Sequence, residues 1–162
     1  MKKKIFVMFI LLILSSSCFA LTNSQVDKYL REYEETGYNF LSSTGDTMWN
    51  VSLKLPDWPA AWSVLVIFTK SDEMQTISIG TTVASSNKSF TSGLLKYLLQ
   101  RNDDEGNLGS FSIYTDDKNY VNYYIKINAA YAQLEQVIES VGYIAGYANA
   151  IEPEISKFIS AE

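Results

Sequence analysis

The chain has 162 residues, the length of a single domain, and its 13 Lys and Arg against 18 Asp and Glu give a net charge of −5. An acidic chain lacks the basic patch that binding to nucleic acid or to anionic lipid surfaces requires. The absence of histidine rules out Ser-His and Cys-His catalytic pairs and histidine-based metal sites. We therefore expect no nucleic-acid partner and no metal or other cofactor.

Residues 1–20 have the three parts of a secretory signal peptide. Lysines at positions 2–4 precede an apolar run at 5–14, and small residues then lead to Ala20. The apolar run is too short to cross a hydrocarbon core of ~30 Å as a helix. We expect cleavage between Ala20 and Leu21. Because three lysines and no acids are lost, the net charge becomes −8.

The expected product is residues 21–162, a single domain without cysteine and without a transmembrane span. Its expected location is the periplasm or the outside of the cell, because the signal peptide directs export. Its stability would depend on the core alone, since a chain without cysteine forms no disulfide bond.

Cys18 leaves an alternative open, in which a lipid on this cysteine anchors the same domain to the cell envelope. Lipoprotein signals place a leucine-like residue three positions before the cysteine, whereas this chain has Ser15 there and Leu14 one residue earlier. Ser16 and Ser17, directly before Cys18, do fit the lipoprotein pattern. A mass shift after lipoprotein processing is blocked would distinguish the two cases.

The first half of the expected domain predicts one helix and a run of strands. Apolar residues at i, i+3, i+4 and i+7 from Val26 indicate an amphipathic helix, capped by Asn23 or Ser24 and ended by Gly37. Alternating or short apolar runs then indicate strands at 38–43, 48–55, 62–68 and 75–83. The third run is almost continuously apolar, so we expect a central strand covered on both faces at least in part.

The second half predicts a helix, a hairpin and a long closing helix. The helix is expected at 89–102, and the hairpin strands at 110–115 and 120–127. The closing helix would be capped by Asn128 and would break at Pro153, since the residue before a proline resists the helical conformation.

Gly142 and Gly146 leave one face of this closing helix without side chains, so we expect another backbone to approach there. The complete order of elements indicates an α+β fold, an antiparallel sheet of five to six strands with helices on one face.

The sequence pattern LLxYLLxxN at 94–102, followed by GSFSI at 109–113, resembles that of the YbjN family. Members of this family are described as bacterial sensory transduction regulators. In that family a helix ending in a leucine pair and an asparagine leads into a strand with glycine and an aromatic residue. The order of the elements is similar over residues 24–160, and the amino-acid sequence itself is similar over residues 94–127. The resemblance implies the fold of the type III secretion chaperones and a dimeric, chaperone-like binding role rather than an enzyme.

The densest acidic stretches, 103–105 and 116–117, fall in predicted turns, where Asp serves local backbone bonding. We therefore expect no catalytic site. A carboxylate-based hydrolase stays open as an alternative, because it needs only two carboxylates that converge in a cleft.

Four aromatic residues form the candidate protein-interaction surface. Trp58 lies in a proline-rich loop, and Tyr114, Tyr120 and Tyr124 share the hairpin face away from the predicted core. They either fill the second face of the sheet or form an exposed patch for a peptide or a second subunit, since Tyr and Trp are enriched at interface hot spots. The expected function is an exported, non-catalytic, chaperone-like or regulatory module that binds a protein or peptide partner as a homodimer.

Overall fold

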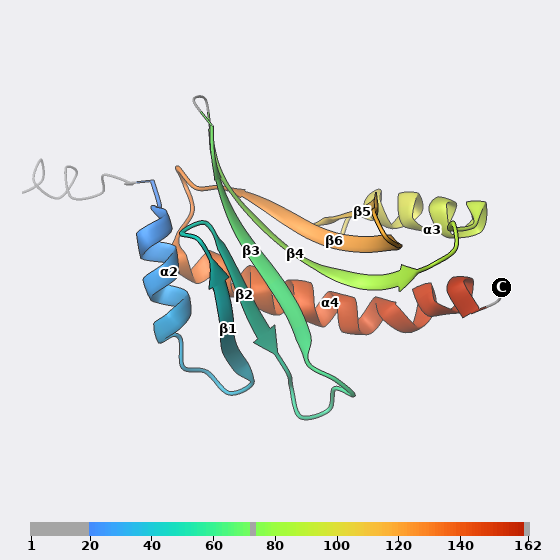
Figure 1. Cartoon of the computed structure of the whole chain (residues 1–162), viewed down its shortest axis with the longest axis horizontal. Coiled ribbons are helices and arrows are strands. Elements are labelled where there is room, and N and C mark those ends of the chain that lie inside the picture. Colours follow the sequence, from blue (N-terminus) through green and yellow to red (C-terminus); the bar gives the residue numbers. More distant parts are fainter. Residues whose placement is uncertain (1–19, 72–73, 161–162) are drawn as a thin grey trace, which may run out of the picture.

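The computed structural model describes residues 20–71 and 74–160, so the predicted signal segment lies outside it except for Ala20 (Figure 1). The helices and strands, in chain order, are α2 (Asn23–Glu32), β1 (Tyr38–Thr44), β2 (Met48–Leu53), β3 (Trp62–Lys70), β4 (Gln75–Ser86), α3 (Ser92–Asn102), β5 (Ser110–Thr115), β6 (Asn119–Asn128) and α4 (Leu134–Ser160). Within the described ranges no helix is both long enough and apolar enough to cross a membrane.

The strands form one antiparallel sheet in the order β1-β2-β3-β4-β6-β5. The predicted α+β fold is thereby confirmed, with six strands and three described helices. The hairpin β5–β6 folds back so that β6 pairs with β4 and β5 becomes the edge of the sheet. The other edge is β1.

The helices pack on one face of the sheet. Helix α4 lies along that face and contacts β2, β3, β4 and β6, while α3 packs against β5 and against α4 (Figure 1). Helix α2 lies against the start of α4, and its Asp27 accepts a hydrogen bond from the Trp49 indole of β2. The strand β3 is central, as predicted, but no helix or strand in the described part of the chain covers its opposite face, where Ile67 is only half-buried.

The core follows the period-two pattern of the strands. Alternate residues point under the helices and are buried: Trp49, Val51, Leu53, Val64, Val66, Phe68, Ile77, Ile79, Val121 and Tyr123. Their partners on α4 are spaced as one helical stripe: Val137, Val141, Ile144, Ala148, Ile151 and Ile155.

Two predictions about the closing helix are wrong. It begins at Leu134 rather than after Asn128, and it continues through Pro153 to Ser160. Tertiary contacts explain the continuation, because Ile155 is fully buried and Phe158 packs on Tyr97 of α3. Pro153 itself is exposed.

The glycines of α4 accommodate aromatic side chains, not a second backbone as predicted. A Cβ atom at Gly142 would lie 2.6 Å from the Tyr38 hydroxyl oxygen, and one at Gly146 would lie 3.9 Å from Cζ2 of Trp58. The close approach at Gly142 therefore comes from β1, whereas the loop between β2 and β3 makes an ordinary van der Waals contact at Gly146.

The start of the domain also differs in detail from the prediction. Thr22 caps α2, and its side chain and that of Gln25 form a capping box, so the cap precedes both predicted residues, Asn23 and Ser24. The helix ends at Glu32, before Gly37. Gly37 adopts a φ of 93°, and a Cβ there would lie 2.4 Å from the carbonyl oxygen of Lys54, so it shapes the entry into β1.

Candidate functional site

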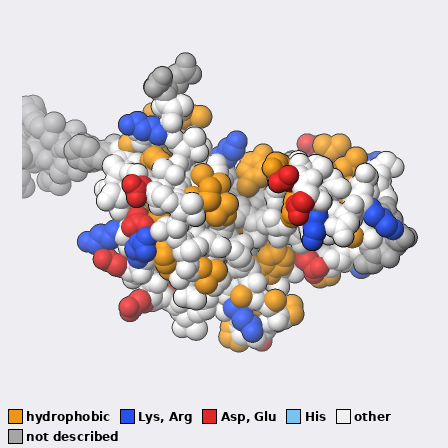
Figure 2. All heavy atoms as spheres, in the orientation of Figure 1, with side chains coloured by type: hydrophobic (Ala, Val, Ile, Leu, Met, Phe, Trp, Pro, Cys, Tyr) orange, Lys and Arg blue, Asp and Glu red, His pale blue; other side chains and the backbone are white. Residues whose placement is uncertain are grey.

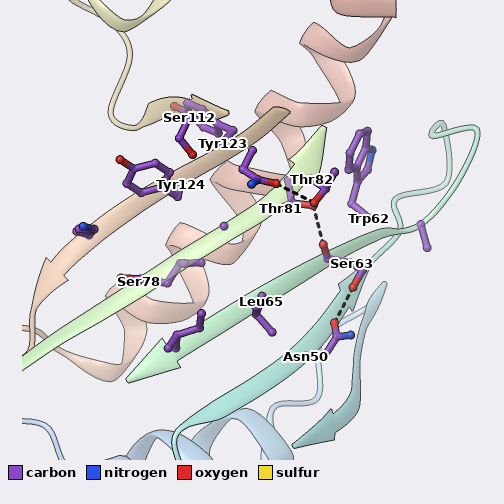
Figure 3. Close-up of a pocket in the computed structure, with 16 residues that line it drawn as sticks. Asn50, Trp62, Ser63, Leu65, Ser78, Thr81, Thr82, Ser112, Tyr123 and Tyr124 are labelled. Atoms are coloured by element: carbon purple, nitrogen blue, oxygen red, sulfur yellow. Dashed lines mark hydrogen bonds between the residues drawn. The ribbon is translucent and has the colours of Figure 1, made fainter. Parts of the chain in front are cut away.

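The uncovered face of the sheet contains an open hollow of about 860 Å³ (Figure 3). Its floor is β4, where Ser78, Gly80 and Thr82 present small side chains or none. A Cβ atom at Gly80 would lie 2.9 Å from Cβ of Tyr124, so this position has no room for a side chain. The hollow is therefore a groove along β4. The larger side chains of the neighbouring strands β3 and β6 rise on either side of it.

The walls of the groove come from β3 and β6. Leu65 and Ile67 stand on the β3 side, and Tyr124 and Lys126 on the β6 side. Leu65 is 36% exposed although its neighbours Val64 and Val66 are fully buried. These walls place apolar side chains on a face that water reaches.

Polar side chains around the groove bond to other groups of the protein. The Thr82 hydroxyl donates to Oδ1 of Asn122 (2.8 Å), and the Ser63 hydroxyl donates to Oδ1 of Asn50 (2.7 Å), as Figure 3 shows. The Thr81 hydroxyl donates to the Ser63 carbonyl (2.6 Å). These three hydroxyl donors are therefore engaged within the protein.

Lys126 is the one charged side chain among the described residues that line the groove. It pairs with Ser78 across β6 and β4, and so lies at one end of the groove. Its ammonium nitrogen is 5.6 Å from the centre of the Tyr124 ring, a cation–π distance. The groove thus combines apolar walls with a cation at one end.

The structure brings together three of the four predicted interaction residues and separates the fourth. Tyr114 and Tyr120 face each other on paired strands with ring centres 6.3 Å apart, and Tyr124 follows on the same face of β6. The Tyr120 hydroxyl donates to Asp117 (2.6 Å), and this bond raises the pKa of Tyr120. Trp58 packs against the core near α4, on the covered side, so it does not belong to this surface.

A second cluster of exposed apolar residues lies where α3 meets β5. Leu95 and Leu99 on α3 are 40% and 65% exposed, and Ile113 on β5 is 41% exposed. Asn102, at the end of α3, accepts from the amide of Phe111 and donates to its carbonyl, with distances of 2.6 and 3.2 Å. The helix thereby caps the beginning of the edge strand.

A polar network fixes α3 to the end of α4. Arg101 contacts Asp104, Glu154 and the Tyr97 hydroxyl at 3.2, 3.0 and 3.1 Å, and Tyr97 also donates to Glu154. Hydrogen bonds from Tyr97 and then Arg101 lower the pKa of Glu154. Burial, followed by the bond to Glu154, raises the pKa of Tyr97.

A stack of tyrosines holds the loop before β5. Tyr123 is fully buried and stacks on Tyr147 at 4.5 Å, and its hydroxyl accepts from the Gly109 amide (3.0 Å) and donates to Asn107. Burial, followed by the contact with Tyr143, raises the pKa of Tyr123. These residues position the loop and the edge strand.

The acidic stretches occupy surface turns. Residues 103–105 are exposed, Asp104 pairs with Arg101, and Asp117 accepts from Tyr120. The described part of the chain contains no group of three or more Cys, Asp or Glu side chains placed to hold a metal ion.

The predicted cleavage position lies at the edge of the folded domain. Leu21 is 7% exposed, and its amide donates to the carbonyl of Ala129 at 2.8 Å. Leu21 is therefore the first residue of the core, whereas Cys18 lies outside the described residues.

No protein-family model and no curated protein matches the chain. Its sites must therefore be interpreted from their own geometry. Of the residues that line the groove, only Tyr124 was among the predicted site residues, and Lys126 was not. A signal for the groove was present in the sequence, because Leu65 and Ile67 occupy the positions of β3 that alternate with its core residues.

Proposed function

We propose that the chain is an exported, non-catalytic protein-binding module that acts as a homodimer through the end where α3 meets β5. One observation carries this proposal. Of the ten large hydrophobic side chains exposed in the described part of the chain, five fall between residues 95 and 114: Leu95, Leu99, Leu108, Ile113 and Tyr114. Single exposed apolar residues are ordinary, whereas a contiguous patch is typical of an interaction site. These five lie on α3, on β5 and in the loop between them, with Ile113 and Tyr114 on opposite faces of the edge strand.

The edge strand at this end suits association with a second copy. Asn102 occupies the backbone groups of Phe111, so the free part of the edge begins after it. Residues 110–115 carry no charge, in a chain with a net charge of −5. Two copies that meet antiparallel at β5 would therefore bring no like charges together in the strand pair, and such an interface is self-complementary.

The two edges of the sheet are not equivalent. In β1 the pairing with β2 shifts register between Phe40 and Ser42, and such a bulge protects an edge from further pairing. In β5 the pairing with β6 is regular over its whole length. Hydrophobic side chains also reach the surface in separate patches between charged ones elsewhere on the molecule (Figure 2). The β5 edge differs from these separate patches because exposed apolar residues lie on both sides of the strand.

The other parts of the proposal rest on the sequence. The tripartite pattern at residues 1–20 supports export, and the wording at 94–113 supports a YbjN-like, type III secretion chaperone-like module. The buried position of Leu21 supports a domain that begins directly after the proposed cleavage site. The lipid-anchored alternative uses the same domain and differs only in the fate of Cys18.

Light scattering coupled to size exclusion tests the interface. We expect the chain without residues 1–20 to be a dimer at micromolar concentration, and Leu99→Glu or Ile113→Glu to make it a monomer that no longer captures a partner. Tyr131→Glu is the matched control, because Tyr131 is 75% exposed but lies far along the chain from this end. A wild-type monomer at every concentration, or a dimer unchanged by both substitutions, would contradict the proposal.

Export is tested separately by the mass of the protein recovered from the cell envelope or medium. We expect a chain that begins at Leu21. A lipid mass on Cys18 would instead establish the anchored form, and recovery of the full chain from the cytoplasm would refute export.

A further inference from the structure

The groove over β4 differs from the α3–β5 end in position and in chemistry. Its floor is made of Ser78, Gly80 and Thr82, and its apolar walls are Leu65 and Ile67 on one side and Tyr124 on the other. From residue 78 to 82 a strand extends about 14 Å. The volume of about 860 Å³ falls within the range of roughly 300–1,000 Å³ that small-molecule sites occupy.

The groove does not suit an extended peptide. The strands β3, β4 and β6 that underlie it are each paired on both sides, so their backbone groups are already used within the sheet. The hydroxyl groups of Ser63 and Thr82 donate to neighbouring asparagines. The paired backbone and the engaged hydroxyl groups favour an occupant whose length contacts the apolar walls Leu65, Ile67 and Tyr124.

The positive charge of Lys126 at the end of the groove indicates that the polar group of the ligand is negative. Lys126 lies beside Ser78 and against the Tyr124 ring, and no carboxylate is present among the described lining residues. The only charge among these described residues is thus positive, in a chain with a net charge of −5. This complementarity favours a ligand with a single negative charge at one end of an alkyl chain.

We propose that the groove binds one free fatty acid, with its alkyl chain over Ser78, Gly80 and Thr82 and its carboxylate at Lys126. The bulky residues of β3 and β6 remove the alkyl chain from water, which supplies the main free energy of binding. The ammonium group of Lys126 sets the orientation and the preference for an anion. The floor and the β3 wall of the site lie away from the proposed dimer edge, although Ser112 of β5 also lines the groove.

Calorimetric titration of residues 21–162 with decanoate, below its critical micelle concentration, tests the proposal. We expect saturable binding of one decanoate per chain, with the amide signals of Gly80 and Tyr124 shifting in a ¹⁵N-correlated spectrum. Decyltrimethylammonium has the same alkyl chain and the opposite charge, and we expect it to bind at least about tenfold more weakly.

Two substitutions test separately how the charge and the shape of the groove contribute to binding. Lys126→Gln is expected to weaken decanoate binding about 1.5- to fivefold, the range for an exposed ionic contact. Lys70→Gln is the matched control, since it removes an equal charge from an exposed position on β3 outside the groove. Ser78→Leu fills the floor of the groove and is expected to abolish binding.

Circular dichroism of each variant establishes that the fold is retained. Lys126→Gln removes only an exposed charge, so it keeps the test valid even if Ser78→Leu does not fold. The proposal is overturned if decanoate does not bind saturably, if Lys126→Gln binds it as tightly as the wild type, or if the cationic amphiphile binds equally well. None of these results depends on whether the chain is exported or dimeric.

Discussion

Ile79 and Gly80 are neighbours on β4, yet Ile79 is fully buried on the face that α4 covers, and Gly80 forms the floor of an open groove. The same contrast holds on β3 between fully buried Val66 and its neighbour Leu65, which is 36% exposed. Each strand thus supplies one side chain to a packed interior and the next to a surface open to water. The two faces of the sheet have the same backbone and different neighbours.

This difference shows which property of a residue depends on local sequence and which depends on packing. Alternation determines the face on which a side chain lies. Whether a helix covers that face depends on elements far away in the chain, here α4, which begins more than fifty residues after Ile79. The composition of the open face, with Ser78 and Thr82 beside Leu65 and Ile67, is intermediate between a core and an ordinary polar surface.

Truncation on the covered face should give the largest effect. Ile79→Ala is expected to lower the free energy of unfolding by about 2–5 kcal/mol, because it removes a fully buried side chain and leaves a cavity under α4. Ser78→Ala, one residue earlier on the open face, is expected to change it by less than about 0.5 kcal/mol. Urea denaturation measures both values. Equal losses at the two positions would mean that the open face is covered in the folded protein.

A polar contact on the same covered face is expected to make an intermediate contribution to the free energy of unfolding. The Trp49 indole is buried and donates to Asp27 at 2.7 Å, and Arg31 donates to the same carboxylate at 2.9 Å. Asp27→Ala leaves the indole N–H without its acceptor and is expected to cost about 1–3 kcal/mol. Asp27→Asn keeps an acceptor oxygen and should cost less. If both substitutions cost the same, the charge of Asp27 rather than its hydrogen bond to Trp49 is decisive.

The same contact predicts a pH dependence. The hydrogen bond from Arg31, more than any other contact, lowers the pKa of Asp27 in the folded protein. The ionised form therefore stabilises the fold above the unfolded pKa of about 3.9, and this contribution is lost as the pH falls through the lower folded value. Asp27→Asn should remove this part of the acid-induced loss of stability. Urea denaturation at pH 7 and at pH 3 measures the difference between the variant and the wild type.

The strands and their orientation could be predicted from the sequence because alternation is a local property. Even so, β4 was predicted to end at residue 83 and extends to Ser86. The pairing with β6 shifts register between Thr82 and Ala84, and a bulge there interrupts the alternation without ending the strand. Pro153 gives the opposite case, where a local helix breaker is overridden by buried Ile155 and by the contact between Phe158 and Tyr97.

The candidate site could be predicted only in part. Tyr114, Tyr120 and Tyr124 were placed together correctly, because they belong to two paired strands of one hairpin. The position of Trp58 depends on how the loop after β2 folds over α4, where Gly146 leaves space for it, and no local pattern encodes that contact. The groove requires β3, β4 and β6 side by side, and β6 is separated from β4 in the sequence by α3 and β5.

A smaller change in stability than that at the covered face is expected at Leu65, where stability and ligand binding can be separated. Leu65→Ser should lower the free energy of unfolding by about 1 kcal/mol, less than a truncation under α4, because the side chain is 36% exposed and packs under no helix. It should nevertheless weaken decanoate binding severalfold, since Leu65 forms part of the apolar wall of the groove. Val66→Ala, on the covered face of the same strand, is expected to do the reverse, lowering stability while leaving the affinity unchanged. Urea denaturation and titration of the same two variants would measure both effects. A loss of stability at Leu65 as large as that at Val66 would show that this wall contributes to the core, and would remove the distinction between the two faces at β3.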